Sequence, residues 1–159
     1  MSSEQFDPEL DLLVERVIRA PREAVWRAWT DPKRFEQWWV PAPAVCRVER
    51  LDVRPGGAIV TRLSEDGKEF VPHLDAVILV ADELERIAFT NAIDSTWRPA
   101  DPQPIAVTGD VFLGDHPDGT AYRMVARHGD PMSRKRHAEL GFADGWGTVI
   151  EQLAAVVEQ

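Results

Sequence analysis

The C-terminal segment, residues 130–159, constrains the fold most strongly, because no proline interrupts it after Pro131. Asp130 followed by Pro131 is typical of a helix start, with a capping carboxylate and then a proline whose missing N–H costs nothing there. Apolar residues then recur at intervals of three and four, as on the buried face of a helix. They are Phe142, Trp146, Val149, Ile150, Leu153, Val156 and Val157. The pattern predicts one long helix of about 40 Å, at 1.5 Å per residue.

Three glycines, Gly141, Gly145 and Gly147, interrupt this apolar helix. Each costs about 1 kcal/mol relative to alanine in a helix. Two explanations stay open: another part of the chain packs closely against the helix, or a space is left beside it. The cations at 134–136 lie where the positive helix end disfavours them, which raises the alternative of a later helix start. A helix of this kind needs a concave sheet to lie in.

The length and composition predict one domain, 1–159, with a flexible polar tail at 1–9. A hydrophobic share of 44% and a charged share of 28% are typical of a soluble globular protein. The net charge of −9 argues against a nucleic-acid partner. Cys46 is the single cysteine and has no internal disulfide partner. Without a signal peptide or an apolar run of about eighteen residues, we expect a cytoplasmic protein with no membrane partner.

The rest of the chain predicts one strand, two short helices and then a series of strands. Residues 10–18 alternate as a strand does, and Pro21 and Pro32 each stand at the start of a short helix, the second of which Asp31 is expected to cap. Six further strands are joined mostly by tight turns, which indicates an antiparallel sheet. They span 44–53, 58–64, 70–80, 84–91, 105–113 and 120–127. The predicted class is α+β, with about seven strands in the order β-αα-ββββββ-α.

One long connection, 92–104, separates two of these strands and carries Trp97 in its middle. Loops of this length without secondary structure are often functional. Trp97 is either part of a flap over an opening or a plug that packs against the surface. Both interpretations stay open.

Several short motifs resemble one known family. They are Thr-Asp-Pro-Lys-Arg-Phe-Glu-Gln-Trp-Trp at 30–39, Asp-Val-Arg-Pro-Gly-Gly at 52–57, Glu-Asp-Gly-Lys at 65–68, Asp-Gly-Thr at 118–120 and Gly-Trp at 145–146. From about Leu10 onward the chain resembles the family of the activator of the 90-kDa heat-shock-protein ATPase, within the START/polyketide-cyclase-like (SRPBCC) superfamily. The resemblance implies a helix-grip fold: a curved antiparallel sheet wraps a long C-terminal helix, two short helices close one end, and a cavity lies between sheet and helix.

No motif of a strong catalytic class is present. The chain lacks a nucleophile elbow, a phosphate loop and a dinucleotide fingerprint. Its four histidines form no His-x-x-x-His pair, so we expect neither a metal nor a cofactor. His73 and Asp75 share one side of a strand, where they form either a cavity acid–base pair or, as the apolar stripe on the other parity favours, part of the solvent face. Asp110 and His128 are further acid–base candidates.

The first functional hypothesis is the binding of a small, largely apolar or aromatic molecule between the sheet and the C-terminal helix. The candidate ligand-binding residues are Trp38, Trp39, His73, Trp97, His128, Phe142 and Trp146. For the tryptophans, core packing is the simpler alternative. The resemblance implies two other functions: a module that stimulates a chaperone ATPase, and a cyclase, dehydratase or hydrolase that uses a cavity acid–base residue. We expect a binding protein rather than an enzyme. A homodimer through a sheet edge or the Trp97 loop is a further possibility.

Overall fold

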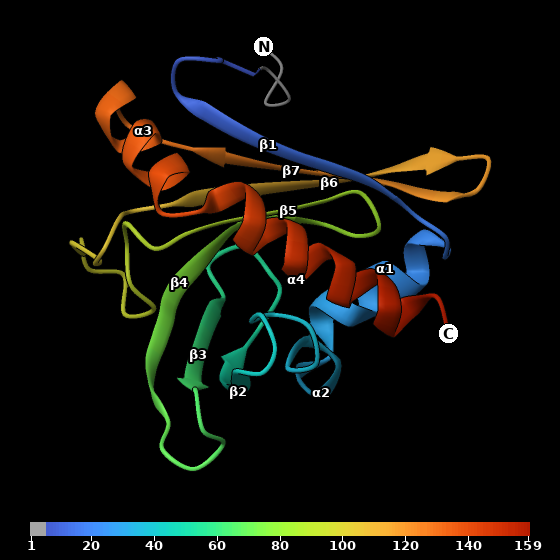
Figure 1. Ribbon diagram of the computed structural model, residues 1–159, viewed down its shortest axis with the longest axis horizontal. Helices are drawn as coiled ribbons and strands as arrows, with labels where there is room; N and C mark the ends of the chain where they lie inside the picture. The colour runs from blue at the N-terminus through green and yellow to red at the C-terminus, as the bar shows by residue number, and fades with distance from the viewer. Residues whose placement is uncertain (1–5) are drawn as a thin grey trace.

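Seven antiparallel strands form one sheet in the computed structural model, which describes residues 6–159 (Figure 1). The strands are β1 (Asp11–Ile18), β2 (Val45–Leu51), β3 (Ala58–Ser64), β4 (Val71–Asp82), β5 (Arg86–Thr90), β6 (Thr108–His116) and β7 (Gly119–Arg127). Their order in the sheet is β1-β7-β6-β5-β4-β3-β2, so the chain's first strand closes the edge beside its last. This arrangement confirms the predicted α+β class.

Four helices pack on this sheet: α1 (Arg22–Thr30), α2 (Pro32–Phe35), α3 (Pro131–Glu139) and α4 (Phe142–Val157). The short helices α1 and α2 follow β1 and lie near the C-terminal end of α4, which crosses one face of the sheet (Figure 1). Asp31 caps α2 as predicted, since its side chain accepts a hydrogen bond from the backbone N–H of Lys33 at 3.0 Å. The arrangement is the expected helix-grip fold.

The C-terminal segment is two helices rather than the single long helix predicted from the sequence. Asp130 caps the first of them as expected, accepting from the N–H of Ser133 at 2.7 Å. At Gly141 the backbone adopts φ +94°, a left-handed conformation that glycine accepts without strain. The apolar stripe therefore belongs to α4 alone, which spans about 24 Å at 1.5 Å per residue. Polar α3, which holds the cations, buries His137.

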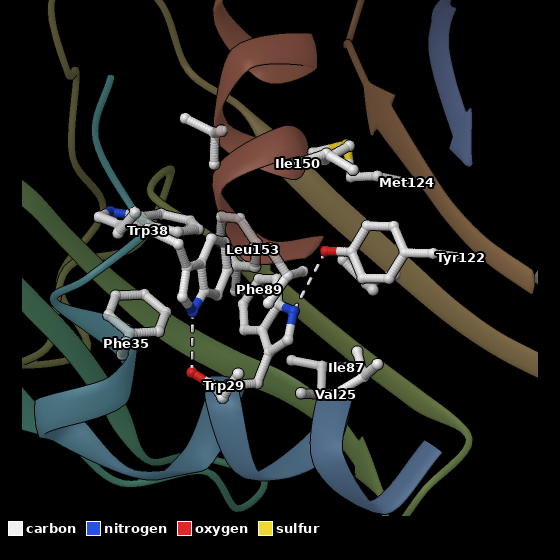
Figure 2. Close-up of a cluster of buried hydrophobic side chains, with 14 of the residues drawn as sticks. Val25, Trp29, Phe35, Trp38, Ile87, Phe89, Tyr122, Met124, Ile150 and Leu153 are labelled. Atoms are coloured by element: carbon white, nitrogen blue, oxygen red, sulfur yellow. Dashed lines mark hydrogen bonds between the residues drawn. The ribbon is translucent and has the colours of Figure 1, made fainter. Parts of the chain in front are cut away.

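The core lies between α1, α2, α4 and the concave face of the sheet, and its centre is the indole of Trp29. Trp29 is fully buried, and its ring lies 5.0 Å from Trp38 and 5.7 Å from Phe35. Figure 2 shows the two hydrogen bonds that fix these indoles: Trp29 Nε1 donates to the Tyr122 hydroxyl at 3.1 Å, and Trp38 Nε1 donates to the carbonyl of Ala28 at 3.0 Å. Burial raises the pKa of Tyr122, so its hydroxyl remains neutral.

Strand bulges and one glycine allow the sheet to curve around this core. The ladder changes register between Val48 and Arg50, between Thr61 and Arg62, and between Ile78 and Val80, and such bulges bend a strand locally. On β6, a Cβ at Gly109 would lie 2.6 Å from the Phe89 ring. The missing side chain therefore provides the space that the aromatic core occupies.

Asp7, in the predicted tail, is bound to the first strand, since its backbone N–H donates to the carboxylate of Asp11 at 2.8 Å. Residues 1–5 of the predicted tail lie outside the described residues. β6 and β7 continue beyond the predicted strand ends at residues 113 and 120, to His116 and Gly119, so two residues lie between these strands.

We expect Gly109→Ala to lower the free energy of unfolding by about 1–3 kcal/mol, because its Cβ would force the Phe89 ring out of position. Gly114→Ala on the same strand is the matched control: its Cβ would meet Ala121 at 3.8 Å, an ordinary contact. This control should change stability by less than about 0.5 kcal/mol. Urea denaturation of both variants checks the prediction. Equal stabilities would contradict it.

Candidate functional site

A cavity of about 380 Å³ lies between the N-terminal half of α4 and the sheet. Phe142, Trp146 and Val149 of α4 form one wall, and Leu74 of β4 lies among the residues facing them. The segment after α2 contributes Trp39, and the end of the long connection contributes residues 103–105. Parts of the chain far apart in sequence thus meet around one space.

Aromatic rings and glycines give the cavity its shape. Trp146 lies 5.5 Å from Trp39 at an interplanar angle of 81°, and 6.4 Å from Phe142. Gly141 and Gly145 line the space beside them, and a Cβ placed on either would meet no atom within 4 Å. Of the two explanations for the helix glycines, the open space is therefore correct for these two. Gly145, which lies inside α4, lowers the stability of the helix, and volume is left for an occupant.

Gln152 fixes the position of the segment that carries Trp39. Its amide nitrogen donates to the carbonyls of Trp38 at 3.1 Å and Val40 at 2.7 Å. Its amide oxygen accepts from the backbone N–H of Ala42 at 2.8 Å. One side chain of α4 therefore satisfies three backbone groups of this segment and holds the aromatic wall against the helix.

Trp39 carries an unusual feature for a buried residue. It is 7% exposed, and its Nε1 is the one buried side-chain nitrogen or oxygen among the described residues that has no hydrogen-bond partner. Such an orphaned donor costs about 1–3 kcal/mol. Unsatisfied buried groups are concentrated at functional sites, where the binding of a ligand matters more than the stability of the free protein.

The polar groups of the cavity are neutral. His73, Asn91, Gln103 and His137 line it, and the lining residues include no Lys, Arg, Asp or Glu. A backbone group orients the side chain of Asn91, since its side-chain oxygen accepts a hydrogen bond from the N–H of Val107 at 2.7 Å. The cavity therefore offers apolar surface and hydrogen bonds, with no charge to compensate a buried ion.

His73 reaches the cavity because of a bulge. Thr61 pairs with Leu74 and Arg62 with Pro72, so His73 is the extra residue of β4. Its Nδ1 lies 3.1 Å from the buried Thr61 hydroxyl, and partial burial lowers the pKa of its ring. Strict alternation favoured the solvent face for both His73 and Asp75. Asp75 does face solvent and accepts from the N–H of Ser95. His73, the extra residue of the bulge, is also exposed but lines the cavity.

A pair of histidines, His128 and His137, closes the α3 side of the cavity and was not predicted from the sequence. His137 Nδ1 lies 2.8 Å from Nε2 of His128, and His128 Nδ1 lies 2.8 Å from the carbonyl oxygen of Leu10. His137 is 9% exposed and packs edge-on against Phe142 with ring centres 5.0 Å apart. Burial, and secondarily the neighbouring His128, lower the pKa of His137 to about 4. The ring is therefore neutral at pH 7.

Four of the seven candidate ligand-binding residues line the cavity, namely Trp39, His73, Phe142 and Trp146. Trp38 is fully buried in the core, and His128 lies behind His137. Trp97 is 68% exposed and lies against the turn before β3, so close that a Cβ on Gly56 would be 2.8 Å from its ring. Of the two interpretations of the long connection, packing against the surface describes Trp97, whereas other residues between β5 and β6, among them 103–105, line the cavity.

Asp110, a further acid–base candidate, belongs to an ion-pair network and not to the cavity lining. It is 2% exposed and binds both Nε and Nη2 of Arg86, at 2.8 and 2.9 Å. Arg127 joins it at 3.1 Å and also reaches the buried Asp11 at 3.3 Å. Two guanidinium groups thus neutralise the two buried carboxylates, which is a structural role.

The described residues 6–159 show neither a metal site nor a membrane span. No three or more of their His, Cys, Asp or Glu side chains are grouped to hold an ion. None of their helices is both long enough and apolar enough to cross a bilayer.

A family model described as "Activator of Hsp90 ATPase homolog 1-like protein" matches residues 19–158. The chain belongs to this family. A comparison with curated proteins finds no match.

Solved structures agree with this assignment. Protein NE0264 from Nitrosomonas europaea is 36% identical, with 97% of each chain covered and a TM-score of 0.85. Two more distant structures share the fold. Protein Ms6760 from Mycobacterium smegmatis is 22% identical, with a TM-score of 0.75 and coverage of 94% of this chain and 91% of that one. The AHSA1-like protein from Aeromonas hydrophila is 18% identical, with a TM-score of 0.67 and coverage of 94% of this chain and 92% of that one. The family assignment and the helix-grip fold are therefore established independently of the motifs.

We expect stability to fall between pH 6.5 and 4 because of His137. Its pKa of about 4 in the folded protein lies below the ordinary 6.5, so the unfolded chain binds more protons in this window. The contribution of His137 to the free energy of unfolding is fully present above pH 6.5, and on the order of 3 kcal/mol of it is lost as the pH falls to 4.

Urea denaturation at pH 7, 6 and 5 measures this dependence. His137→Asn removes the titrating ring and should flatten the slope. Identical slopes for the wild type and His137→Asn would show that another group is responsible.

Proposed function

We propose that the protein binds a small, neutral, largely apolar molecule in the cavity between α4 and the sheet. The observation that carries the proposal is the combination of aromatic walls with helix glycines that leave about 380 Å³ open. Ligand sites of drug-sized molecules commonly enclose about 300–1,000 Å³ and are mostly apolar with a few polar groups. Trp39, Trp146 and Phe142 suit a flat, ring-containing body.

The expected affinity is weak. A two-ring molecule that buries roughly 250 Å² of apolar surface gains on the order of 6 kcal/mol. The loss of its translational and rotational freedom opposes this gain. Because the walls are held by packing and by Gln152, little reorganisation is added to that cost. A gain of about 6 kcal/mol alone corresponds to a dissociation constant of about 40 μM, so with the opposing cost we expect a constant in the high-micromolar to millimolar range.

The two helix glycines allow a matched test. Gly145 lines the cavity, whereas Gly147 does not, and a Cβ on either meets no atom within 4 Å. We expect Gly145→Leu to fill the cavity and to weaken binding of the neutral dye N-phenyl-1-naphthylamine at least about tenfold, the equivalent of 1.4 kcal/mol. Gly147→Leu should bind like the wild type. Both should be as stable as the wild type or more stable, because leucine is the better helix former.

Dye fluorescence titrations and thermal unfolding of the three proteins check this proposal. Unchanged stability together with selective loss of binding in Gly145→Leu supports the cavity as the site. Equal dye binding by all three proteins would place the dye elsewhere and contradict the proposal, as would a wild type that binds no dye.

The family description carries a second candidate function, the stimulation of a chaperone ATPase. Trp97 favours this candidate, because an indole that is 68% exposed and held against Gly56 is suited to a protein contact. In an ATPase assay with the purified 90-kDa chaperone of the same organism, the wild type should raise turnover and Trp97→Ala should lose most of the effect. Gly145→Leu is the control that should keep it. A wild type without effect would remove this candidate.

A further inference from the structure

The histidine pair at the α3 side of the cavity has a defined direction of hydrogen bonding. It begins at the carbonyl oxygen of Leu10, which only accepts, so Nδ1 of His128 carries the proton of their 2.8 Å contact. A neutral His128 then has a bare Nε2. This nitrogen accepts from Nδ1 of His137, again at 2.8 Å. The proton of the neutral His137 ring is therefore on Nδ1.

Nε2 of His137 is consequently an acceptor without a proton. No described residue forms a hydrogen bond with it, and it is not among the buried nitrogens and oxygens that lack a partner, so it retains access to the space around it. His137 lines the cavity. The low pKa of the ring keeps this acceptor unprotonated at neutral pH.

The other polar groups of the cavity compete poorly for a donor. The side-chain oxygen of Asn91 already accepts from Val107, and Nδ1 of His73 pairs with the Thr61 hydroxyl. His73 and Gln103 are exposed, where water competes for their remaining hydrogen bonds. His137, by contrast, is 9% exposed and contacts the Phe142 ring. A ligand donor gains most where water is scarce.

We propose that the cavity selects neutral molecules with a flat apolar body and one hydroxyl or N–H group, and that this group donates a hydrogen bond to Nε2 of His137. The inference rests on the proposed function, since it names the class of ligand for the same cavity. His128 and the Leu10 carbonyl are positioning groups, because they hold the proton on the far nitrogen of His137.

Competition between two matched molecules tests this inference. 2-Naphthol carries a donor on a flat apolar body, whereas 2-methoxynaphthalene has the same rings without the donor. Each is used to displace N-phenyl-1-naphthylamine from the wild type at pH 7. Because one hydrogen bond is worth about 0.5–1.5 kcal/mol, we expect 2-naphthol to bind about 3- to 10-fold more tightly.

Two variants separate the ligand contact from the structural pair. In His137→Asn the amide nitrogen stands near the former Nδ1 and still donates to His128, but the acceptor is lost. In His137→Gln the amide oxygen stands near the former Nε2 and restores the acceptor. We expect the preference for 2-naphthol to disappear in the first variant and to return in the second. A structural effect alone would change both variants alike.

The outcomes distinguish the role of His137 from the role of the cavity as a binding site. The same preference in the wild type and in His137→Asn overturns the role of His137, and so does equal displacement by both molecules, while the cavity itself stays a binding site. A wild type that binds neither the dye nor the two molecules overturns both proposals.

A measurement on the unmodified protein complements the variants. In protein labelled with ¹⁵N-histidine, Nε2 of His137 should show the chemical shift of an unprotonated ring nitrogen at pH 7. The shift should move when 2-naphthol is added and stay in place with the methyl ether. A protonated Nε2 on His137 would overturn the inference without reference to any variant.

Discussion

The packing of Trp29 against the sheet is the contact on which the rest of this structure depends. Its indole is fully buried, lies within 6 Å of the rings of Phe35, Trp38 and Trp39, and donates to the Tyr122 hydroxyl of β7. Edge-to-face aromatic pairs add about 0.5–1.5 kcal/mol each beyond the area they bury. Through this cluster the short helices become a fixed end of the sheet, and Trp39 acquires its place in the cavity wall.

The break at Gly141 gives the two C-terminal helices different tasks. Once the chain turns there with a positive φ, α4 lays its apolar face on the sheet while α3 closes the side of the cavity with His137. A continuous helix would carry the polar residues 131–139 along the same line as the apolar stripe. Gln152 holds the opposite wall through three backbone hydrogen bonds. The open volume therefore lies between anchored walls.

Local chemistry made much of this fold predictable from the sequence, because caps and turns act over a few residues. Asp31, Asp130 and the alternating strands were placed correctly for that reason. The site was less accessible to such reasoning. The bulge that brings His73 into the cavity lining is visible only in the pairing of β3 with β4. His137 becomes a hydrogen-bond partner of His128 only because the chain reverses direction between them. Trp97 could be recognised as a surface residue only from its packing on Gly56.

The distribution of charge decides what kind of molecule suits the cavity. The chain carries a net charge of −9, and its buried carboxylates, Asp11 and Asp110, are paired with arginines in a network that excludes the cavity residues. An ion in the cavity would meet aromatic rings and neutral side chains, with no opposite charge to offset its lost hydration. A neutral molecule loses little hydration there and can satisfy one hydrogen bond. His137 stays uncharged at pH 7 because burial, and secondarily the neighbouring His128, lower the pKa of its ring.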